Sequence, residues 1–252
     1  QLPAIIARGF DPEVKAAMLA RLAPVFTAIT ATRQSLPTNK DLIGFAGAPF
    51  TLACYMIEGR SVPGFPRTLA WAQAQPAPFA RLMDILTQAV ISFLQAQKKS
   101  GADIVKIFDS WSALIPHDLH EVALYAPHRL IVATPNLTPL ITFPKGFPHG
   151  HTDLVAYQQQ TQARIIAIDH HRPMAEVAQQ LPKDIILQGN LDPQLLRIGG
   201  AAMKQAVEQQ LDTMAQLASP YIFNLGHGID KTTPPDHVAQ LINIIQQYQP
   251  TS

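Results

Sequence analysis

The sequence has a single cysteine, few charged residues and no excess of either charge. Cys54 alone cannot form a disulfide within the chain or supply a zinc site built on several thiolates. Charged residues make up 15% of the 252 residues, and 19 Lys and Arg against 18 Asp and Glu leave a net charge of +1. Since no strong field of one sign results, the composition favours neither nucleic acid nor a membrane surface as a partner. Any anionic ligand must therefore be bound by local groups.

A long hydrophobic run and a secretion signal are also missing from the pattern. No apolar run approaches the length that spans a bilayer, and Gln1 is not followed by a basic segment and then an apolar one. The lone cysteine fits a reducing compartment, so a cytoplasmic location is expected. With 47% hydrophobic residues, the chain can bury a full core.

Six short runs of apolar residues predict strands. They are near-continuously apolar, as expected where helices cover both faces of a parallel sheet. The runs lie at residues 41–47, 103–110, 139–146, 164–171, 184–191 and 221–228. Because longer amphipathic segments alternate with them, the sequence predicts an α/β fold, and the periodicity is compatible with either an open doubly wound sheet or a barrel.

The amphipathic segments predict helices. Apolar residues recur every three or four positions over 76–100 and 200–218, and the first of these segments ends in a basic turn followed by a glycine. A further helix is predicted over 11–36, starting at Asp11 with Pro12 in its first turn. The sequence shows no internal repeat or long linker, so the chain is expected to form a single domain.

Nearly every predicted strand ends in a polar or glycine-containing cluster, such as FDSW, GNLD and GHGID. Ligands of parallel α/β folds bind at the carboxyl ends of the strands, where these clusters would meet. In GFAGAP, Gly44 and Gly47 are expected to let the backbone turn sharply and approach a ligand, and the next segment carries Tyr55 to the same rim. The alternative is that Gly and Pro only mark the turn between a strand and a helix.

Four motifs follow one another along the chain: GFAGAPFTLACYMIEG (44–59), IFDSW (107–111), QGNLDP (188–193) and FNLGHGI (223–229). Together they resemble the uroporphyrinogen decarboxylase family of haem biosynthesis, and the resemblance extends from about residue 40 to the C-terminus. It implies a (β/α)8 TIM barrel that forms one domain over 1–252. In that barrel, 1–40 would be a helical linker region and 41–252 would form six βα units, which are strands three to eight.

The resemblance also implies a reaction. Members of this family remove CO2 from the four acetate arms of uroporphyrinogen and give coproporphyrinogen, without a metal or an organic cofactor. The ring carbon beside an acetate must first be protonated, because the protonated ring can then accept the electron pair that the departing CO2 leaves behind. The protein must supply a proton donor, cations for the substrate carboxylates and a partner for the pyrrole N–H groups.

One residue of the first motif and one residue of the second match active-site positions of the family. Tyr55, in CYMIEG, matches a tyrosine that lies near the reacting acetate, which implies a catalytic role. The alternative is a helix tyrosine with its ring in the core and its hydroxyl in water. Ser110, in FDSW, matches a Ser or Thr that contacts a substrate carboxylate. A serine that caps the following helix would explain the same residue.

Two further positions match substrate-binding residues of the family. His227, in NLGHG, matches a histidine that binds a substrate carboxylate, and its flanking glycines open the backbone around it. A lone histidine of this kind is more often a packed structural residue. Phe108 resembles an aromatic wall against the macrocycle, and a core phenylalanine is an equally good interpretation.

Other polar residues at the strand ends are interpreted as structural. Asp109 ends a buried strand, which would make it a candidate catalytic carboxylate, but the family tolerates Glu at this position. Asn190 and Asp192 are expected to fix their loop by local hydrogen bonds from side chain to backbone.

Four histidines could suggest a metal site. His149, His151, His170 and His171 are interpreted as rim residues, because the adjacent pair is expected to point to opposite faces of a strand and lacks the spacing of metal ligands. A second family on this barrel, the corrinoid-dependent methyltransferases, uses zinc held by His and Cys. With Cys54 as the one cysteine, such a site is unsupported, and no metal is expected.

Two motifs of the family do not occur in the chain: an arginine motif similar to RQAGRYLPEYR, and one similar to FSDI, whose aspartate gathers the pyrrole N–H groups. Arg33 and Gln34, in RQSLP, stand in the wrong order and context for the arginine motif. We therefore expect the chain to be the C-terminal part of a longer polypeptide, which the resemblance implies is a homodimer. The alternative is a shortened relative that binds tetrapyrroles without catalysis.

Overall fold

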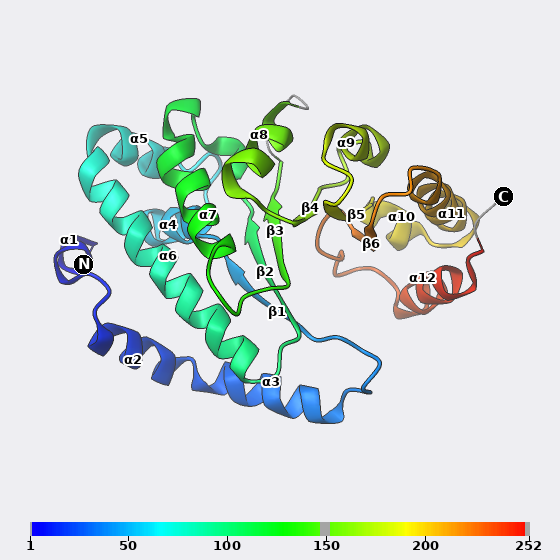
Figure 1. Cartoon of the computed structure of the whole chain (residues 1–252), viewed down its shortest axis with the longest axis horizontal. Helices are drawn as coiled ribbons and strands as arrows, with labels where there is room; N and C mark the ends of the chain where they lie inside the picture. Colours follow the sequence, from blue (N-terminus) through cyan, green and yellow to red (C-terminus); the bar gives the residue numbers. More distant parts are fainter. Residues whose placement is uncertain (1, 147–151, 250–252) are drawn as a thin grey trace. The chain divides into compact units, whose positions relative to one another are not determined.

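All six predicted strands are present in the computed structural model, which describes residues 2–146 and 152–249 (Figure 1). The strands are β1 (Ile43–Gly47), β2 (Ile104–Asp109), β3 (Leu140–Pro144), β4 (Ile165–Ala167), β5 (Ile186–Leu191) and β6 (Tyr221–Leu225). The chain divides into two compact units: Gln1–Pro148 with Gln159–Ala163, and His149–Gln158 with Arg164–Ser252. Each unit has three of these strands, which pair in parallel in the order of the chain.

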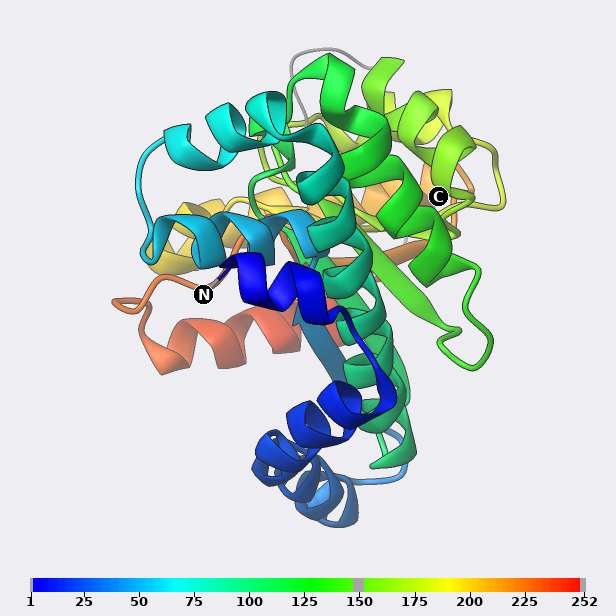
Figure 2. The ribbon, with the colours of Figure 1, turned by 90° about the vertical axis from the view of Figure 1, so that its left-hand side faces the viewer.

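In the first unit, β2 lies between β1 and β3, so that Phe108 has Gly47 on one side and Phe143 on the other. The helices of this unit are α1 (Leu2–Arg8), α2 (Pro12–Arg21), α3 (Ala23–Ser35), α4 (Pro49–Glu58), α5 (Pro66–Ala74), α6 (Pro76–Lys99) and α7 (Ala126–Val132). Short helical turns between β2 and α7 are η1 (Ser112–Leu114), η2 (His117–Leu119) and η3 (Glu121–Tyr125). The long helix α6 contacts β1, β2, α4, α5 and α7, and Figure 2 shows it running through the unit.

The apolar side of α6 forms a core with the strands and α7. Its buried residues are Ala46, Ala48, Val90, Leu94, Val105, Ile107, Ile131, Leu137 and Leu140. The helix ends as predicted, in Lys98 and Lys99, and Gly101 follows with a φ of 113°, in the region that favours glycine. The amphipathic pattern over 76–100 is therefore explained by burial of one face of α6.

Gly44 lies inside β1 and Gly47 is its last residue, and the turn into α4 comes at Ala48, so the expectation of a sharp turn at the two glycines themselves was wrong. A Cβ on Gly44 would lie 2.6 Å from Gln97 Oε1, and one on Gly47 would lie 3.2 Å from Leu52 Cδ2. The two glycines therefore let helices approach the strand. At Gly44, the amide of Gln97 accepts a hydrogen bond from Phe45 N–H and donates one to Phe45 C=O, both at 2.9 Å. The N–H and C=O groups of Phe45 point away from β2 and cannot form hydrogen bonds with it. Gln97 therefore satisfies both groups.

The single helix predicted over 11–36 is two helices. Asp11 caps α2 as expected, since its Oδ1 accepts a hydrogen bond from Val14 N–H at 2.7 Å. Leu22 separates α2 from α3, and the two helices are bent by 56° at this break. Pro24 lies in the first turn of α3. Its ring and its missing N–H suit the start of a helix but not the continuation of the preceding one.

Arg33 holds the segment that leads from α3 into β1. Its guanidinium donates hydrogen bonds to three backbone carbonyls within 36–40 and to Asp103 Oδ2, the last at 2.7 Å. Leu42 N–H also donates to Asp103 Oδ2, and this bond, together with Arg33, holds the pKa of Asp103 below its ordinary value. Arg33 thus has a structural role before β1.

The second unit has β5 between β4 and β6. Its helices are α9 (Met174–Gln180), α10 (Pro193–Ile198), α11 (Gly200–Gln216) and α12 (Pro235–Gln247), with the first part of α8 (Thr152–Thr161). Helices α10, α11 and α12 pack around a core of Leu191, Leu196, Met203, Val207 and Leu241. Helix α11 confirms the helix predicted over 200–218.

Helix α6 is long and apolar enough to cross a bilayer by length and composition, so the prediction that no apolar run approaches this length was wrong. Half of its most apolar window is buried inside the protein (50%), and α2 with α3 passes the same test only if the bent pair is taken as one segment. The apolar residues of α6 are used in the core of the first unit.

The strands and helices establish an α/β fold with parallel strands, as predicted. The closed (β/α)8 barrel and the single domain over 1–252 stay predictions.

Candidate active site

The carboxyl ends of β1 and β2 bring together three of the residues predicted to form the site: Tyr55, Phe108 and Ser110. Helix α4 begins directly after β1 with Pro49 in its first turn, where the missing N–H of proline loses no helical hydrogen bond. Ala48 N–H donates to Phe108 C=O at 3.0 Å. The start of the helix that carries Tyr55 is therefore tied to the end of β2.

Tyr55 packs on two other aromatic rings. Its centroid lies 5.7 Å from that of Phe65 and 6.4 Å from that of Trp111, both in edge-to-face geometry, and the rings of Phe65 and Trp111 are 4.9 Å apart. Such pairs are attractive and fix ring orientation. Tyr55 remains 40% exposed. Its ring lies at the accessible edge of an aromatic cluster and not inside the core, which favours the functional interpretation over the structural one.

Ser110 is held by a hydrogen-bond network that starts on α4. Its N–H donates to Thr51 Oγ1 at 2.9 Å, and the Thr51 hydroxyl donates to Asp109 Oδ1 at 2.6 Å. Asp109 Oδ2 lies 3.5 Å from His128 Nε2 on α7, and both of these side chains are fully buried. The cap of η1 is Trp111, without a capping bond from a side chain. The interpretation of Ser110 as a helix cap is therefore wrong.

Phe108 and Asp109 face opposite sides of β2. Every second residue of this strand is buried, and Asp109 belongs to the buried set, whereas Lys106 and Phe108 belong to the half-buried set. The ring of Phe108 lies 6.0 Å from that of Phe45 on β1. Asp109 therefore joins β2 to α4 and α7. Phe108 lies on the opposite face of β2, where its ring contacts Phe45.

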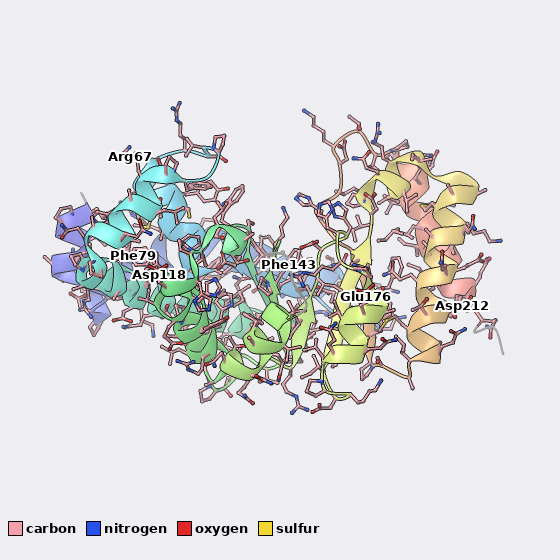
Figure 3. The ribbon with its side chains drawn as sticks, turned by 90° about the horizontal axis from the view of Figure 1, so that it is seen from above. Arg67, Phe79, Asp118, Phe143, Glu176 and Asp212 are labelled. Carbon is pink, nitrogen blue, oxygen red and sulfur yellow. The ribbon has the colours of Figure 1, made fainter. Side chains whose placement is uncertain are left out.

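The end of the CYMIEG motif positions the next helix. Gly59 closes α4 with a φ of 75°, a conformation that favours glycine. Glu58 Oε1 accepts hydrogen bonds from the N–H groups of Arg67 at 2.8 Å and Thr68 at 3.1 Å, so it caps the start of α5, where Figure 3 labels Arg67. Because Phe65 lies just before α5, this cap also supports the aromatic cluster beneath Tyr55.

His227 lies in the second unit, after β6. It is exposed, and its Nδ1 lies 3.4 Å from Gly228 C=O. The interpretation of His227 as a packed structural residue is therefore wrong. A Cβ on Gly226 would lie 2.2 Å from the backbone nitrogen of His170. This glycine makes room for the loop that follows β4, and Gly226 N–H donates to Leu191 C=O at 2.9 Å.

His170 and His171 lie in a turn after β4, so the prediction that they point to opposite faces of a strand was wrong. Strand β4 ends at Ala167, and the chain then turns, with His171 N–H donating to Asp169 Oδ1 at 3.0 Å. The two imidazole rings lie 3.9 Å apart, tilted by 41°. The adjacent histidines thus pack against each other.

Asp192 makes the local hydrogen bond that was predicted. Its Oδ1 accepts from Gln194 N–H at 2.8 Å and caps α10. The amide of Asn190 instead donates to the carbonyls of Asp169 at 2.8 Å and Arg172 at 2.6 Å. Asn190 therefore holds the loop after β4 and not its own loop, so the prediction of a local bond at Asn190 was wrong.

A metal site has little support in the part of the chain that the structure describes, where no group of three His, Cys, Asp or Glu side chains could hold an ion. His149 and His151 lie outside the described residues. Cys54 is buried in α4, and burial, followed by the nearby Asp109 and Glu58, raises the pKa of its thiol well above the ordinary value. A thiol in this state is a small apolar side chain rather than a thiolate ligand.

Sequence reasoning missed three residues that support the site: Thr51, Phe65 and Trp111. Trp111 carried a signal, because it directly follows Ser110 in FDSW. Thr51 and Phe65 carried none, since their contacts are distant in sequence; Thr51 binds Asp109 from 58 residues away.

Comparison with known proteins identifies a family for this chain. The family model for uroporphyrinogen decarboxylase (URO-D) matches residues 6–248. Among curated relatives, the uroporphyrinogen decarboxylase of Granulibacter bethesdensis is 40% identical over 91% of this chain and 67% of that protein. That of Acidiphilium cryptum is 39% identical over 96% and 67%, and that of Gluconacetobacter diazotrophicus is 43% identical over 82% and 58%. The chain thus spans between 58% and 67% of the length of these relatives.

A solved structure of a methyltransferase from Methanosarcina mazei aligns with a TM-score of 0.74 at 17% identity, covering 90% of this chain and 64% of that one. At this identity the likeness shows a shared fold alone. The family model matches nearly the whole chain, and the curated relatives share the sequence identities given above. The chain belongs to the uroporphyrinogen decarboxylase family.

Proposed function

We propose that the protein decarboxylates the four acetate side chains of uroporphyrinogen to give coproporphyrinogen, as a carboxy-lyase of tetrapyrrole biosynthesis that needs no cofactor. The family match over residues 6–248 carries this proposal. It is supported by the position of Tyr55 and Ser110 together at the carboxyl ends of neighbouring strands. The complete protein would fold as a (β/α)8 barrel, with β1 to β6 as strands three to eight, and would act as a homodimer in the cytoplasm.

The chemistry assigns a role to each residue. A proton adds to the ring carbon next to the one that bears the acetate, which places positive charge on the carbon that bears it. The bond to the carboxylate then breaks, CO2 leaves, and the electron pair forms a double bond between the ring and the remaining CH2 group. A proton adds to this CH2 group to complete the methyl group, and the first proton leaves the ring carbon, which restores the aromatic pyrrole. Phe108 would support a pyrrole ring, Ser110 and His227 would bind substrate carboxylates, and the Tyr55 hydroxyl would form a hydrogen bond beside the reacting acetate.

The rigidity of the site supports these roles. Thr51 and Asp109 fix the backbone of Ser110, and the rings of Phe65 and Trp111 fix Tyr55. Groups that are already oriented before the substrate binds stabilise developing charge without having to reorganise. Tyr55 is at once held by its neighbours and accessible, as a group that meets a large substrate must be.

The proposal is tested by incubating the full-length protein with uroporphyrinogen under anaerobic conditions. The products are then oxidised to porphyrins and separated by their number of carboxylates. We expect the eight-carboxylate substrate to be converted through seven-, six- and five-carboxylate intermediates to the four-carboxylate product. Binding of the substrate without any of these products would support the non-catalytic alternative and refute the proposed reaction.

A further inference from the structure

Lys106 has an unusual position for a lysine. It lies in the middle of β2, between Val105 and Ile107, which are fully buried on the side of the helices. Lysine is depleted in strands and is rarely withdrawn from water. Because the side chains alternate along the strand, Lys106 faces the same side as Phe108 and away from the helices. The packing of the helices therefore does not explain its presence.

Aromatic and aliphatic side chains surround Lys106 on this face. In the register of the strands, Phe45 of β1 lies on one side and Ile141 of β3 on the other. The ammonium nitrogen lies 4.9 Å from the centroid of Phe143, which Figure 3 labels, in a cation–π contact. The rings of Phe45 and Phe108 are 6.0 Å apart. A positive charge is thus placed among three phenylalanine rings of neighbouring strands.

This environment weakens the hydration of the charge. Burial lowers the pKa of Lys106 to about 8, so the amine is still mostly protonated at neutral pH. An ammonium group that has lost part of its water shell attracts an anion more strongly than an exposed lysine does, because the effective dielectric constant around it is lower. The phenylalanine rings offer apolar surface to the face of a pyrrole ring. The combination suits a ring system that carries carboxylates.

We propose that Lys106 binds a carboxylate arm of the substrate, while the pyrrole rings contact Phe45, Phe108 and Phe143. This inference rests on the proposed function, and it adds a charged substrate-binding residue to Ser110 and His227. It also explains why a lysine occurs at this point of β2, because its positive charge binds a carboxylate on the face that the substrate contacts.

The matched variants are Lys106→Met, which keeps the length of the side chain and removes its charge, and Lys106→Arg, which keeps the charge. Lys99→Met is the control, because Lys99 is an exposed lysine at the end of α6 in the same unit. In the full-length protein, K106M should raise the KM for uroporphyrinogen by about tenfold, which corresponds to about 1.4 kcal/mol. K106R should stay within about threefold of the wild type, and K99M should match it.

A second readout follows binding without turnover. Coproporphyrin, a flat ring system with four carboxylates, is titrated against each protein and its binding is measured from the change in its absorption. We expect K106M to bind about tenfold more weakly than the wild type, and added salt to weaken binding to the wild type more than binding to K106M. Coproporphyrin should also protect Lys106 of the wild-type protein from an amine-specific reagent, as read by peptide mass spectrometry. This last measurement needs no variant to fold.

The outcomes separate this inference from the proposed function. If the wild type decarboxylates uroporphyrinogen and K106M has the same KM, the assignment of Lys106 is overturned and the proposed reaction stands. If K106M mainly lowers the melting temperature with an unchanged KM, Lys106 is structural and the assignment is again overturned. If the protein binds coproporphyrin through Lys106 but releases no CO2, the assignment stands and the reaction is refuted. If the wild type neither decarboxylates nor binds coproporphyrin, both are refuted.

Discussion

Thr51→Val should destabilise the first unit, because one hydroxyl group serves both Asp109 and Ser110. Valine has nearly the shape of threonine, so the substitution removes the hydroxyl without leaving a large cavity. It deprives Asp109 Oδ1, which is fully buried, of a donor at 2.6 Å, and Ser110 N–H of an acceptor at 2.9 Å. A buried polar group without a partner costs about 1–3 kcal/mol. With about 2 kcal/mol for Asp109 and about 1 kcal/mol for the half-buried Ser110, we expect a loss of about 3 kcal/mol.

Thr51→Ser is the matched control, since it keeps the hydroxyl and loses one methyl group, at a cost of about 1 kcal/mol. Both tryptophans of the chain, Trp71 and Trp111, lie in the first unit, so their fluorescence during urea unfolding reports on this unit. A difference of about 2 kcal/mol between the two variants is expected, with T51V the less stable. Equal stability of T51V and T51S within about 0.5 kcal/mol would refute the role assigned to the shared hydroxyl.

Three further predictions concern single residues. Tyr55→Phe should lower turnover by about one to two orders of magnitude and leave the melting temperature unchanged, because it removes one polar group and keeps the aromatic contacts; unimpaired steady-state product formation would contradict its catalytic role. His227→Asn should raise the KM or let partly decarboxylated intermediates accumulate, as seen by chromatography of the porphyrins, whereas a lower melting temperature with the same product profile would make His227 structural. Cys54 should react with iodoacetamide at mildly alkaline pH at least about tenfold more slowly in the folded protein than in guanidinium chloride, since its raised pKa leaves little thiolate; similar rates in both states would show that the thiol is accessible.

The strands were predictable because their signal is local. Each is a short, near-continuous apolar run between turn residues, and all six runs formed strands. The helix over 11–36 was harder, since its apolar pattern continues through Leu22, and only Pro24 marks the start of a second helix. The end of β4 at Ala167 was also not readable, because the isoleucines on either side of this residue continue the apolar pattern. The apolar pattern thus predicts where helices and strands lie, but it predicts less well at which residue each one ends.

The site was predictable only in part. The motifs pointed to Tyr55, Phe108 and Ser110, and the structure brings these three to neighbouring strand ends. What holds them in place depends on partners that are distant in sequence, such as Thr51 for Ser110, and no pattern within a motif indicates such a pair. Lys106 was overlooked for a related reason: in the sequence it only interrupts an apolar strand, and its aromatic surroundings come from three different strands.

The pairing of Gln97 with the backbone of Phe45 ties two positions of the sequence to each other. Gln97 can reach Phe45 only because Gly44 has no side chain, since a Cβ there would lie 2.6 Å from the amide oxygen. A larger residue at position 44 therefore requires the amide of Gln97 to move away or to be replaced, and Phe45 then needs another hydrogen-bond partner. Among relatives of this chain, we expect the residues at 44 and 97 to covary, with glycine accompanying glutamine and a bulkier residue accompanying a shorter one.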